Sequence, residues 1–178
     1  MLRKMMLFAC CLLLMMSFAC AEEQVLLEYT VTNGAKMVPF LYPASCCIVD
    51  DGSLGVFVYL NGAEYVALSI PSRRVSGTEK LRENIGDDSK IRVLTDNMYV
   101  FAVHGDENHR RPDADIVCVG LNLPDGTGII ANADCCYGQT GIYDVLLSIV
   151  ASMADAEPLK VWLDEEWLPE ITEKAAQF

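Results

Sequence analysis

The spacing of apolar residues changes late in the chain, and this change predicts a strand followed by a helix. The apolar run at 128–133 follows the turn signal Pro124-Asp125-Gly126, as strands commonly do. After a loop carrying Cys135, Cys136 and Gly138, apolar residues recur every three or four positions. They are Ile142, Val145, Leu146, Ile149, Val150 and Met153, and they predict one buried face of a helix. The hydroxyl of Thr140 is placed to cap the first turn of that helix.

The first third of the chain is typical of short antiparallel strands separated by turns. Asn33-Gly34 lies between two β-rich runs and is the strongest hairpin signal in the chain. Asn61-Gly62 is a second signal of the same kind. The predicted strands are 25–31, 37–41, 46–49, 54–60 and 65–70.

The remaining segments add strands and helices in alternation. A short helix is expected to begin within 76–78 and to end at Gly86. Further strands are predicted at 91–94, 98–103 and 116–121, with a polar loop from His104 to Asp113. Pro158 suits the first turn of another helix, whereas Pro169 is expected to limit its continuity. This order predicts an α+β fold in which helices cover a mainly antiparallel sheet.

The first 21 residues have the three parts of a secretory signal peptide. Arg3 and Lys4 are basic, 5–16 is apolar, and Ala19-Cys20-Ala21 offers small residues for cleavage. The apolar run is too short for a membrane-spanning helix, which needs roughly 20 apolar residues. We therefore expect a secreted or extracytoplasmic protein in which 22–178 forms a single domain. An alternative keeps Cys20 as the lipid-bearing first residue of a lipoprotein, which would anchor the protein to a membrane.

The charge of the chain narrows the range of partners. The formal net charge is −12, and it becomes more negative once Arg3 and Lys4 are removed. Because an acidic surface repels phosphate backbones, we expect no nucleic-acid partner. The acidity favours solubility and cationic partners.

The cysteines form two vicinal pairs, Cys46-Cys47 and Cys135-Cys136, together with the isolated Cys118. Adjacent residues of an extended chain point to opposite faces, so one member of each pair is expected to face the core. An oxidising compartment allows a disulfide between the two pairs. Buried free thiols are the alternative, and neither pair has the C-x-x-C spacing of zinc or thioredoxin motifs. The odd number leaves at least one thiol unpaired within the chain.

One polar loop contains a candidate metal site. His104, Asp106 and His109 could ligate zinc or another divalent ion, and Asp113 and Asp115 could assist. The spacing matches no established motif, so a solvated turn is the alternative.

Two further groups of residues could carry chemistry. Cys118 and His104 are the only candidates for a cysteine nucleophile and its base, but Cys118 lies in an apolar strand typical of a core. Tyr137, Trp162 and Trp167 could form an aromatic binding surface or could pack a helix onto the sheet.

Several segments together resemble the PsbP/DcrB-like superfamily of αβα sandwiches, which includes exported bacterial lipoproteins and photosystem accessory proteins. They are Phe40-Leu41-Tyr42-Pro43 leading into a short strand, the hairpin of 54–60 and 65–70, and the strand 128–133 with the helix ending at 148–153. The chain departs from many relatives by carrying Cys46-Cys47 where they place a tryptophan. The resemblance implies an αβα sandwich with a binding or accessory role. It transfers no catalytic residue and no cofactor.

These observations predict an exported, non-catalytic binding or accessory protein. Its partner would be a protein or a small ligand, and it would contact a membrane only through a lipid on Cys20. The alternative is a small secreted metal-dependent protein that uses the loop from His104 to His109.

Overall fold

The computed structural model describes most of the chain after its N-terminal segment. The described residues are 24–52, 54–71, 75–104, 114–136 and 139–175. The predicted signal peptide, Cys20, Asp106, His109 and Tyr137 lie outside these ranges.

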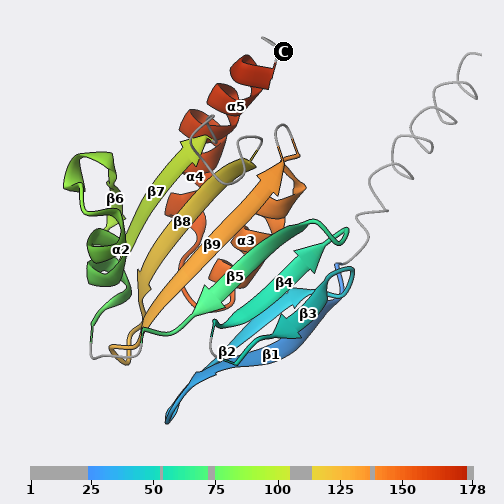
Figure 1. Cartoon of the computed structure of the whole chain (residues 1–178), viewed down its shortest axis with the longest axis vertical. Coiled ribbons are helices and arrows are strands. Elements are labelled where there is room, and N and C mark those ends of the chain that lie inside the picture. The colour runs from blue at the N-terminus through green and yellow to red at the C-terminus, as the bar shows by residue number, and fades with distance from the viewer. Residues whose placement is uncertain (1–23, 53, 72–74, 105–113, 137–138, 176–178) are drawn as a thin grey trace, which may run out of the picture.

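A seven-stranded antiparallel sheet forms the centre of the structure (Figure 1). Its order is β3-β4-β5-β9-β8-β7-β6. The strands are β3 (Cys47–Asp50), β4 (Val56–Leu60), β5 (Glu64–Ser69), β6 (Arg92–Thr95), β7 (Met98–His104), β8 (Ala114–Asn122) and β9 (Gly128–Cys136). The longest strands, β8 and β9, pair over their whole length in the middle of the sheet, so both of their faces are available for packing.

The first two strands form a separate hairpin. Strand β1 (Leu26–Asn33) pairs with β2 (Lys36–Pro43) around the predicted turn at Asn33-Gly34. Gly34 has a φ of 63°, a left-handed conformation that glycine adopts without strain. The hairpin packs against helix α3 (Gly141–Ala151), and the hydroxyl of Ser152 accepts a hydrogen bond of 2.9 Å from the Leu41 amide.

One face of the sheet, here called the inner face, carries the hydrophobic core. Alternate residues of the central strands, such as Val117, Val119 and Ala131, are completely buried there. Helix α3 packs on this face through Leu146 and Ile149, which belong to the three-four pattern predicted from the sequence. Helices α4 (Glu157–Trp162) and α5 (Leu168–Ala175) continue the same layer, and Figure 1 shows α3 and α4 behind the sheet.

The opposite face, here called the outer face, is covered by a helix at one end only. Helix α2 (Gly77–Ile85) begins with a capping box between Ser76 and Glu79 and ends at Gly86, in agreement with the predicted limits. Its first turn lies directly on β8 and β9, where Gly120 and Gly128 leave room for the backbone of the helix. A short 3₁₀ turn, η1 (Asp88–Lys90), connects α2 to β6.

Three local expectations differ from the structure. Strand β9 continues through Cys135 and Cys136, because these residues keep pairing with β8 instead of entering a loop. Thr140 precedes α3 in a helical conformation and makes no side-chain capping hydrogen bond. Pro169 does not end the C-terminal helix, since α4, a π-helical turn at Leu163–Trp167 and α5 follow one another without a break. The wider π turn accommodates the proline ring, which would clash with a carbonyl of a regular α-helix.

The predicted fold class, α+β with a mainly antiparallel sheet, is confirmed. Among the described residues, no helix combines the length and apolar character that crossing a bilayer requires.

Replacing Gly77 by alanine should destabilise the fold strongly. A Cβ atom there would overlap the carbonyl oxygens of Leu121 and Ile129, which belong to the central strands. We expect Gly77→Ala to lower the free energy of unfolding by at least about 3 kcal/mol, measured by urea denaturation. Gly86→Ala is the matched control, because it has open space and only its φ of 68° to oppose a side chain. It should cost about 1 kcal/mol, and equal losses in both variants would contradict the close packing of α2.

Candidate functional site

A row of titratable residues crosses the inner face at the end of the sheet farthest from α2. Strand register places His104 opposite Asp115, and Asp115 opposite Cys135. The pairing of Tyr65 with Asp134 extends the row to Glu64 on β5. Directly opposite residues on one face of a sheet have neighbouring side chains, so these four groups form one polar row.

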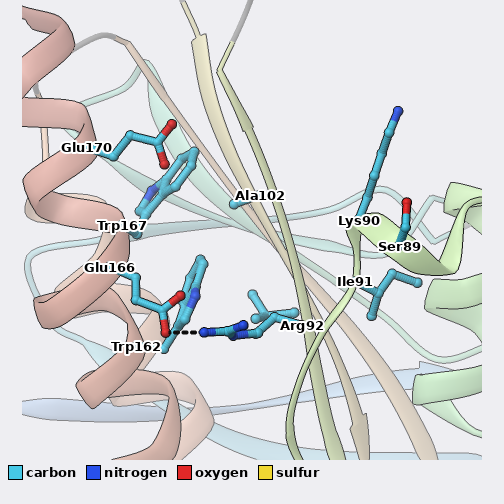
Figure 2. Close-up of a pocket in the computed structure, with 10 residues that line it drawn as sticks. Ser89, Lys90, Ile91, Arg92, Ala102, Trp162, Glu166, Trp167 and Glu170 are labelled. Atoms are coloured by element: carbon cyan, nitrogen blue, oxygen red, sulfur yellow. Dashed lines mark hydrogen bonds and ion pairs between the residues drawn. The ribbon is translucent and has the colours of Figure 1, made fainter.

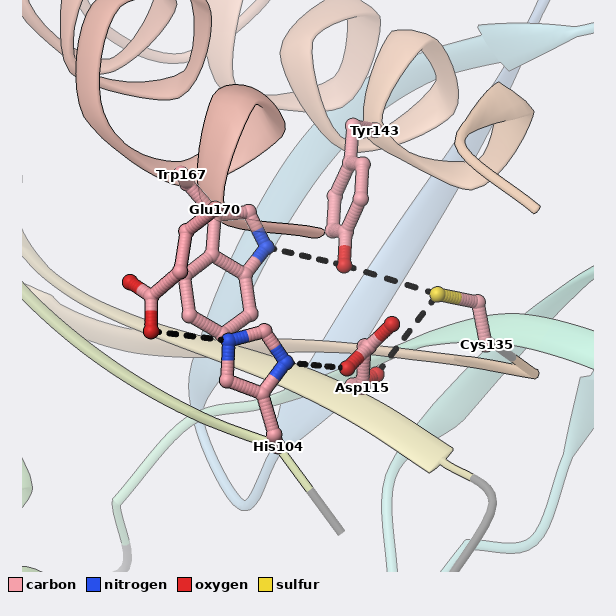
Figure 3. A network of polar contacts seen from close by, with 6 residues as sticks. All are labelled: His104, Asp115, Cys135, Tyr143, Trp167 and Glu170. Atoms are coloured by element: carbon pink, nitrogen blue, oxygen red, sulfur yellow. Dashed lines mark hydrogen bonds and ion pairs between the residues drawn. The ribbon is translucent and has the colours of Figure 1, made fainter. Parts of the chain in front are cut away.

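His104 connects the row to the C-terminal helix (Figure 3). Its Nδ1 atom lies 2.6 Å from Oδ1 of Asp115, so the imidazole donates a hydrogen bond to the buried carboxylate. Its Nε2 atom lies 3.2 Å from Oε1 of Glu170, a separation that permits an ion pair when the ring is protonated. The ring also stacks on Trp167, with centroids 4.4 Å apart and an interplanar angle of 18°. The imidazole therefore joins β7, β8 and α5.

A second set of contacts links the row to α3. The indole Nε1 of Trp167 donates a 3.0 Å hydrogen bond to the hydroxyl oxygen of Tyr143. The same hydroxyl lies 3.4 Å from Sγ of Cys135. Burial, followed by the nearby Cys135 group, raises the pKa of Tyr143 above its usual value. Burial also raises the pKa of the Cys135 thiol to about 11, so the thiol stays protonated at neutral pH.

The row buries two carboxyl groups. Asp115 is 0% exposed and Glu64 is 3% exposed. Within the part of the chain that the structure describes, Asp115 Oδ2 and Glu64 Oε1 have no hydrogen-bond partner. Burial raises the pKa of Glu64, which favours its neutral form in the folded chain. The row is thus an energetically costly feature that the surrounding core maintains.

The π-helical turn arranges the two tryptophans of the chain. Trp162 and Trp167 are five residues apart and would diverge on a regular α-helix, but a π turn brings such positions onto one face. Their rings are stacked at 6.0 Å with an interplanar angle of 15°. The ring of His104 also stacks on Trp167, so the indole of Trp167 contacts two other aromatic rings.

A cleft of about 260 Å³ opens beside this stack (Figure 2). Its residues are Ser89, Lys90, Ile91 and Arg92 on one side, Val100 and Ala102 at the sheet, and Trp162, Glu166, Trp167 and Glu170 on the helical side. Figure 2 shows Arg92 reaching towards Glu166, with 2.6 Å between Nη2 and Oε1. Both of these side chains are more than half exposed, so the ion pair is accessible to a competing charged group.

The predicted metal ligands are not brought together in the described structure. His104 takes part in the polar row, while Asp106 and His109 lie outside the described residues. Among residues that the structure describes, no group of three or more histidine, cysteine or acidic side chains is arranged to hold a metal ion. Asp115, named as an assisting residue, instead accepts the hydrogen bond of the imidazole.

The five cysteines of the described chain are free thiols. The predicted alternation is confirmed, since Cys46 and Cys135 are buried whereas Cys47 is exposed and Cys136 is half-buried. The disulfide suggested between the two pairs is not formed. Strands β4 and β5 separate β3 from β9, so the pairs are about 14 Å apart, far beyond disulfide reach.

Cys118 and His104 do not form a nucleophile and base. Cys118 pairs with Phe101, and the alternation along β7 and β8 places it on the outer face, opposite the imidazole. Burial raises the pKa of Cys118 to about 12. Cys118 is half-buried on the outer face and does not belong to the hydrophobic core that its apolar surroundings predicted.

Part of the site had no clear signal in the sequence. Glu64, Tyr143 and Glu170 come from separate elements and meet only in the folded chain. Trp162 and Trp167 are buried, as helix packing predicts, and their stack also lines the cleft. Asp115 could have been found more directly, because strand alternation gives it the same face as the apolar Val117 and Val119.

Comparison of the chain with protein-family models, with curated proteins and with solved structures finds no match in any of the three.

The Tyr143 hydroxyl should contribute measurably to stability. In Tyr143→Phe, the buried indole N–H of Trp167 loses its acceptor, so we expect the free energy of unfolding to fall by about 1–3 kcal/mol. Urea denaturation followed by tryptophan emission measures this change. Tyr99→Phe is the control, because its half-exposed ring keeps its place under the Arg82 guanidinium, and a change within about 0.5 kcal/mol is expected. Equal stability of Tyr143→Phe and the unmodified chain would contradict the role assigned to this network.

Proposed function

We propose that this chain is an exported, non-catalytic binding protein that holds a small zwitterionic ligand in the cleft beside the indole stack. The observation that carries the proposal is that groups of both charges line this cleft. Lys90 and Arg92 line one side, whereas Glu166 and Glu170 line the other, next to two aromatic rings. A ligand with a carboxylate, an ammonium group and an apolar ring matches all three features.

The geometry of the cleft suits a small and specific ligand. Arg92 is held on a strand and presents a planar guanidinium, which binds carboxylates through two parallel hydrogen bonds. Its present partner, Glu166, is freed when a ligand carboxylate takes its place and can then receive the ligand ammonium. Because the indoles are fixed by stacking and by the Tyr143 hydrogen bond, little ordering would accompany binding.

The state of the nucleophilic groups supports a binding role. The thiols of Cys118 and Cys135 have pKa values raised to about 12 and about 11. Thiols in this state are poor nucleophiles at neutral pH.

The proposal includes export and a PsbP/DcrB-like sandwich. Export is supported by the basic, apolar and small-residue segments at 1–21, and a lipid on Cys20 would tether the same domain to a membrane. The sandwich is supported by helices on both faces of the sheet, with α2 on the outer face and α3 on the inner face. An accessory role in such a family is consistent with ligand binding.

Three compounds with one ring and different charges test the ligand class. Both tryptophans of the chain line the cleft, so intrinsic emission reports on its occupancy. We expect phenylalanine to change the emission with an affinity about tenfold higher than 3-phenylpropionate or phenethylamine, since each of these lacks one charged contact. Arg92→Gln and Glu166→Gln should each weaken phenylalanine binding by about tenfold.

The matched control for these variants is Arg82→Gln. Arg82 also belongs to an exposed ion pair, with Asp88, but its guanidinium lies over Tyr99 on the outer face. Its loss should leave binding unchanged. Equal affinities for the three compounds, or an equal loss of phenylalanine affinity in all three variants, would refute the zwitterion site.

Intact mass spectrometry of protein isolated from its native host tests export and thiol state together. We expect a mature chain that begins at Glu22 and has five thiols that react with iodoacetamide after unfolding without reduction. In the folded protein, Cys47 should react first, because it is exposed, whereas burial protects Cys46 and Cys135. A lipid on Cys20 would instead indicate a protein anchored to a membrane. Thiols that react only after reduction would contradict the free-thiol state.

A further inference from the structure

The outer face of the sheet carries two aligned rows of side chains beyond the end that α2 covers. The register defines both rows from β3 across to β7. One row is Val49, Phe57, Ala67, Asn132, Cys118 and Phe101, and the other is Cys47, Tyr59, Tyr65, Asp134, Ile116 and Val103. Most of these side chains are half-buried, and Val49 is 50% exposed.

The composition of these rows is unusual for the face that helices leave open. Antiparallel sheets with one packed face normally alternate apolar residues inside with polar residues outside. Here aromatic and aliphatic residues dominate both faces, and α2 packs only at the end marked by Gly120 and Gly128. A partly exposed apolar surface of this kind is typical of a site that contacts another molecule.

Three aromatic rings form the centre of this surface on β4 and β5. The ring centroids of Phe57 and Tyr65 are 5.6 Å apart, and those of Tyr59 and Tyr65 are 5.5 Å apart. The hydroxyl of Tyr65 donates a 3.0 Å hydrogen bond to a carboxylate oxygen of Asp134. That bond increases the electron density of the ring, and electron-rich ring faces attract cations.

The strands of this surface carry no basic residue. Strands β3, β4, β5, β9 and β8 contain neither lysine nor arginine. Asp134 lies on the outer face, whereas Asp50, Glu64 and Asp115 alternate onto the inner face. The whole chain has a net charge of −12. The surface therefore combines apolar area and aromatic faces on an acidic chain, which together complement a segment that is both apolar and basic.

We infer that the outer face binds an apolar, lysine- or arginine-containing segment of a protein partner across Phe57, Tyr59 and Tyr65. The aliphatic residues of the segment lie on the rows of β3 to β5, and its cations lie over the ring faces. This surface is on the opposite side of the sheet from the cleft of the proposed ligand. A binding protein built in this way contacts its ligand and its partner through separate faces.

Model peptides of opposite charge test the inference. The probes are decapeptides of alternating leucine with lysine, glutamine or glutamate, and fluorescence anisotropy at about 0.15 M salt measures their binding. We expect only the lysine peptide to bind. In Phe57→Leu/Tyr65→Leu, which keeps apolar area but removes two ring faces, its Kd should rise by about tenfold. The control is Val161→Ser, which changes an exposed apolar residue on α4, and it should bind as the unmodified chain does.

Four results would overturn the inference. The first is that the lysine peptide binds the double variant and the unmodified chain with equal Kd values. The second is that the glutamine or glutamate peptide binds as tightly as the lysine peptide, and the third is that none of the three peptides binds. The fourth is that the chain dimerises through the same face. The last is detected by sedimentation of the chain alone, as self-association that Phe57→Leu/Tyr65→Leu abolishes. If net charge alone attracted the lysine peptide, its Kd would be unchanged in the double variant, and binding would disappear at higher salt. A titration of the double variant with phenylalanine, followed by tryptophan emission, tests the cleft separately from the outer face.

Discussion

The pairing of β8 with β9 is the constraint on which the rest of the structure depends. These two strands are aligned from Ala114 with Cys136 to Asn122 with Gly128. They are packed along the inner face and, at the end that α2 covers, on the outer face as well. Side chains alternate with a period of two, so a slip of one residue would move Asp115 and Cys135 out of the polar row. It would also remove Gly120 and Gly128 from beneath α2, where no side chain fits. One register thus sets the core, the polar row and the helix position together.

Burying the polar row costs free energy, and contacts between the row and the neighbouring elements offset this cost. Asp115 is completely buried, and Nδ1 of His104 lies within hydrogen-bond distance of its Oδ1 atom, at 2.6 Å. His104 then stacks on Trp167, whose indole N–H is satisfied by Tyr143 on α3. Since each group satisfies or packs against the next, the row attaches the C-terminal helices to the sheet with defined geometry. That geometry keeps the indoles in place beside the cleft.

Much of the fold could be predicted from the sequence because its signals are local. Asn33-Gly34 specifies a tight turn, and the box formed by Ser76 and Glu79 specifies a helix start. The period of the apolar residues then separates the strands from α3. Errors arose where a neighbouring element decided the outcome. Cys135 and Cys136 remain in a strand because β8 provides their hydrogen bonds, and the helix passes Pro169 because a π turn precedes it.

The candidate site was less predictable, although His104 and the tryptophans could be singled out from the sequence. By itself the sequence determined the alternation of faces, the helix and turn signals and the acidity, because these depend on residues close together in the chain. Only the tertiary structure decided that His104 meets Asp115, that Glu170 approaches the same ring, and that Cys118 faces the other way. The physical reason is that strand register and the π turn arise from contacts between distant segments, and these contacts choose which locally compatible residues become neighbours.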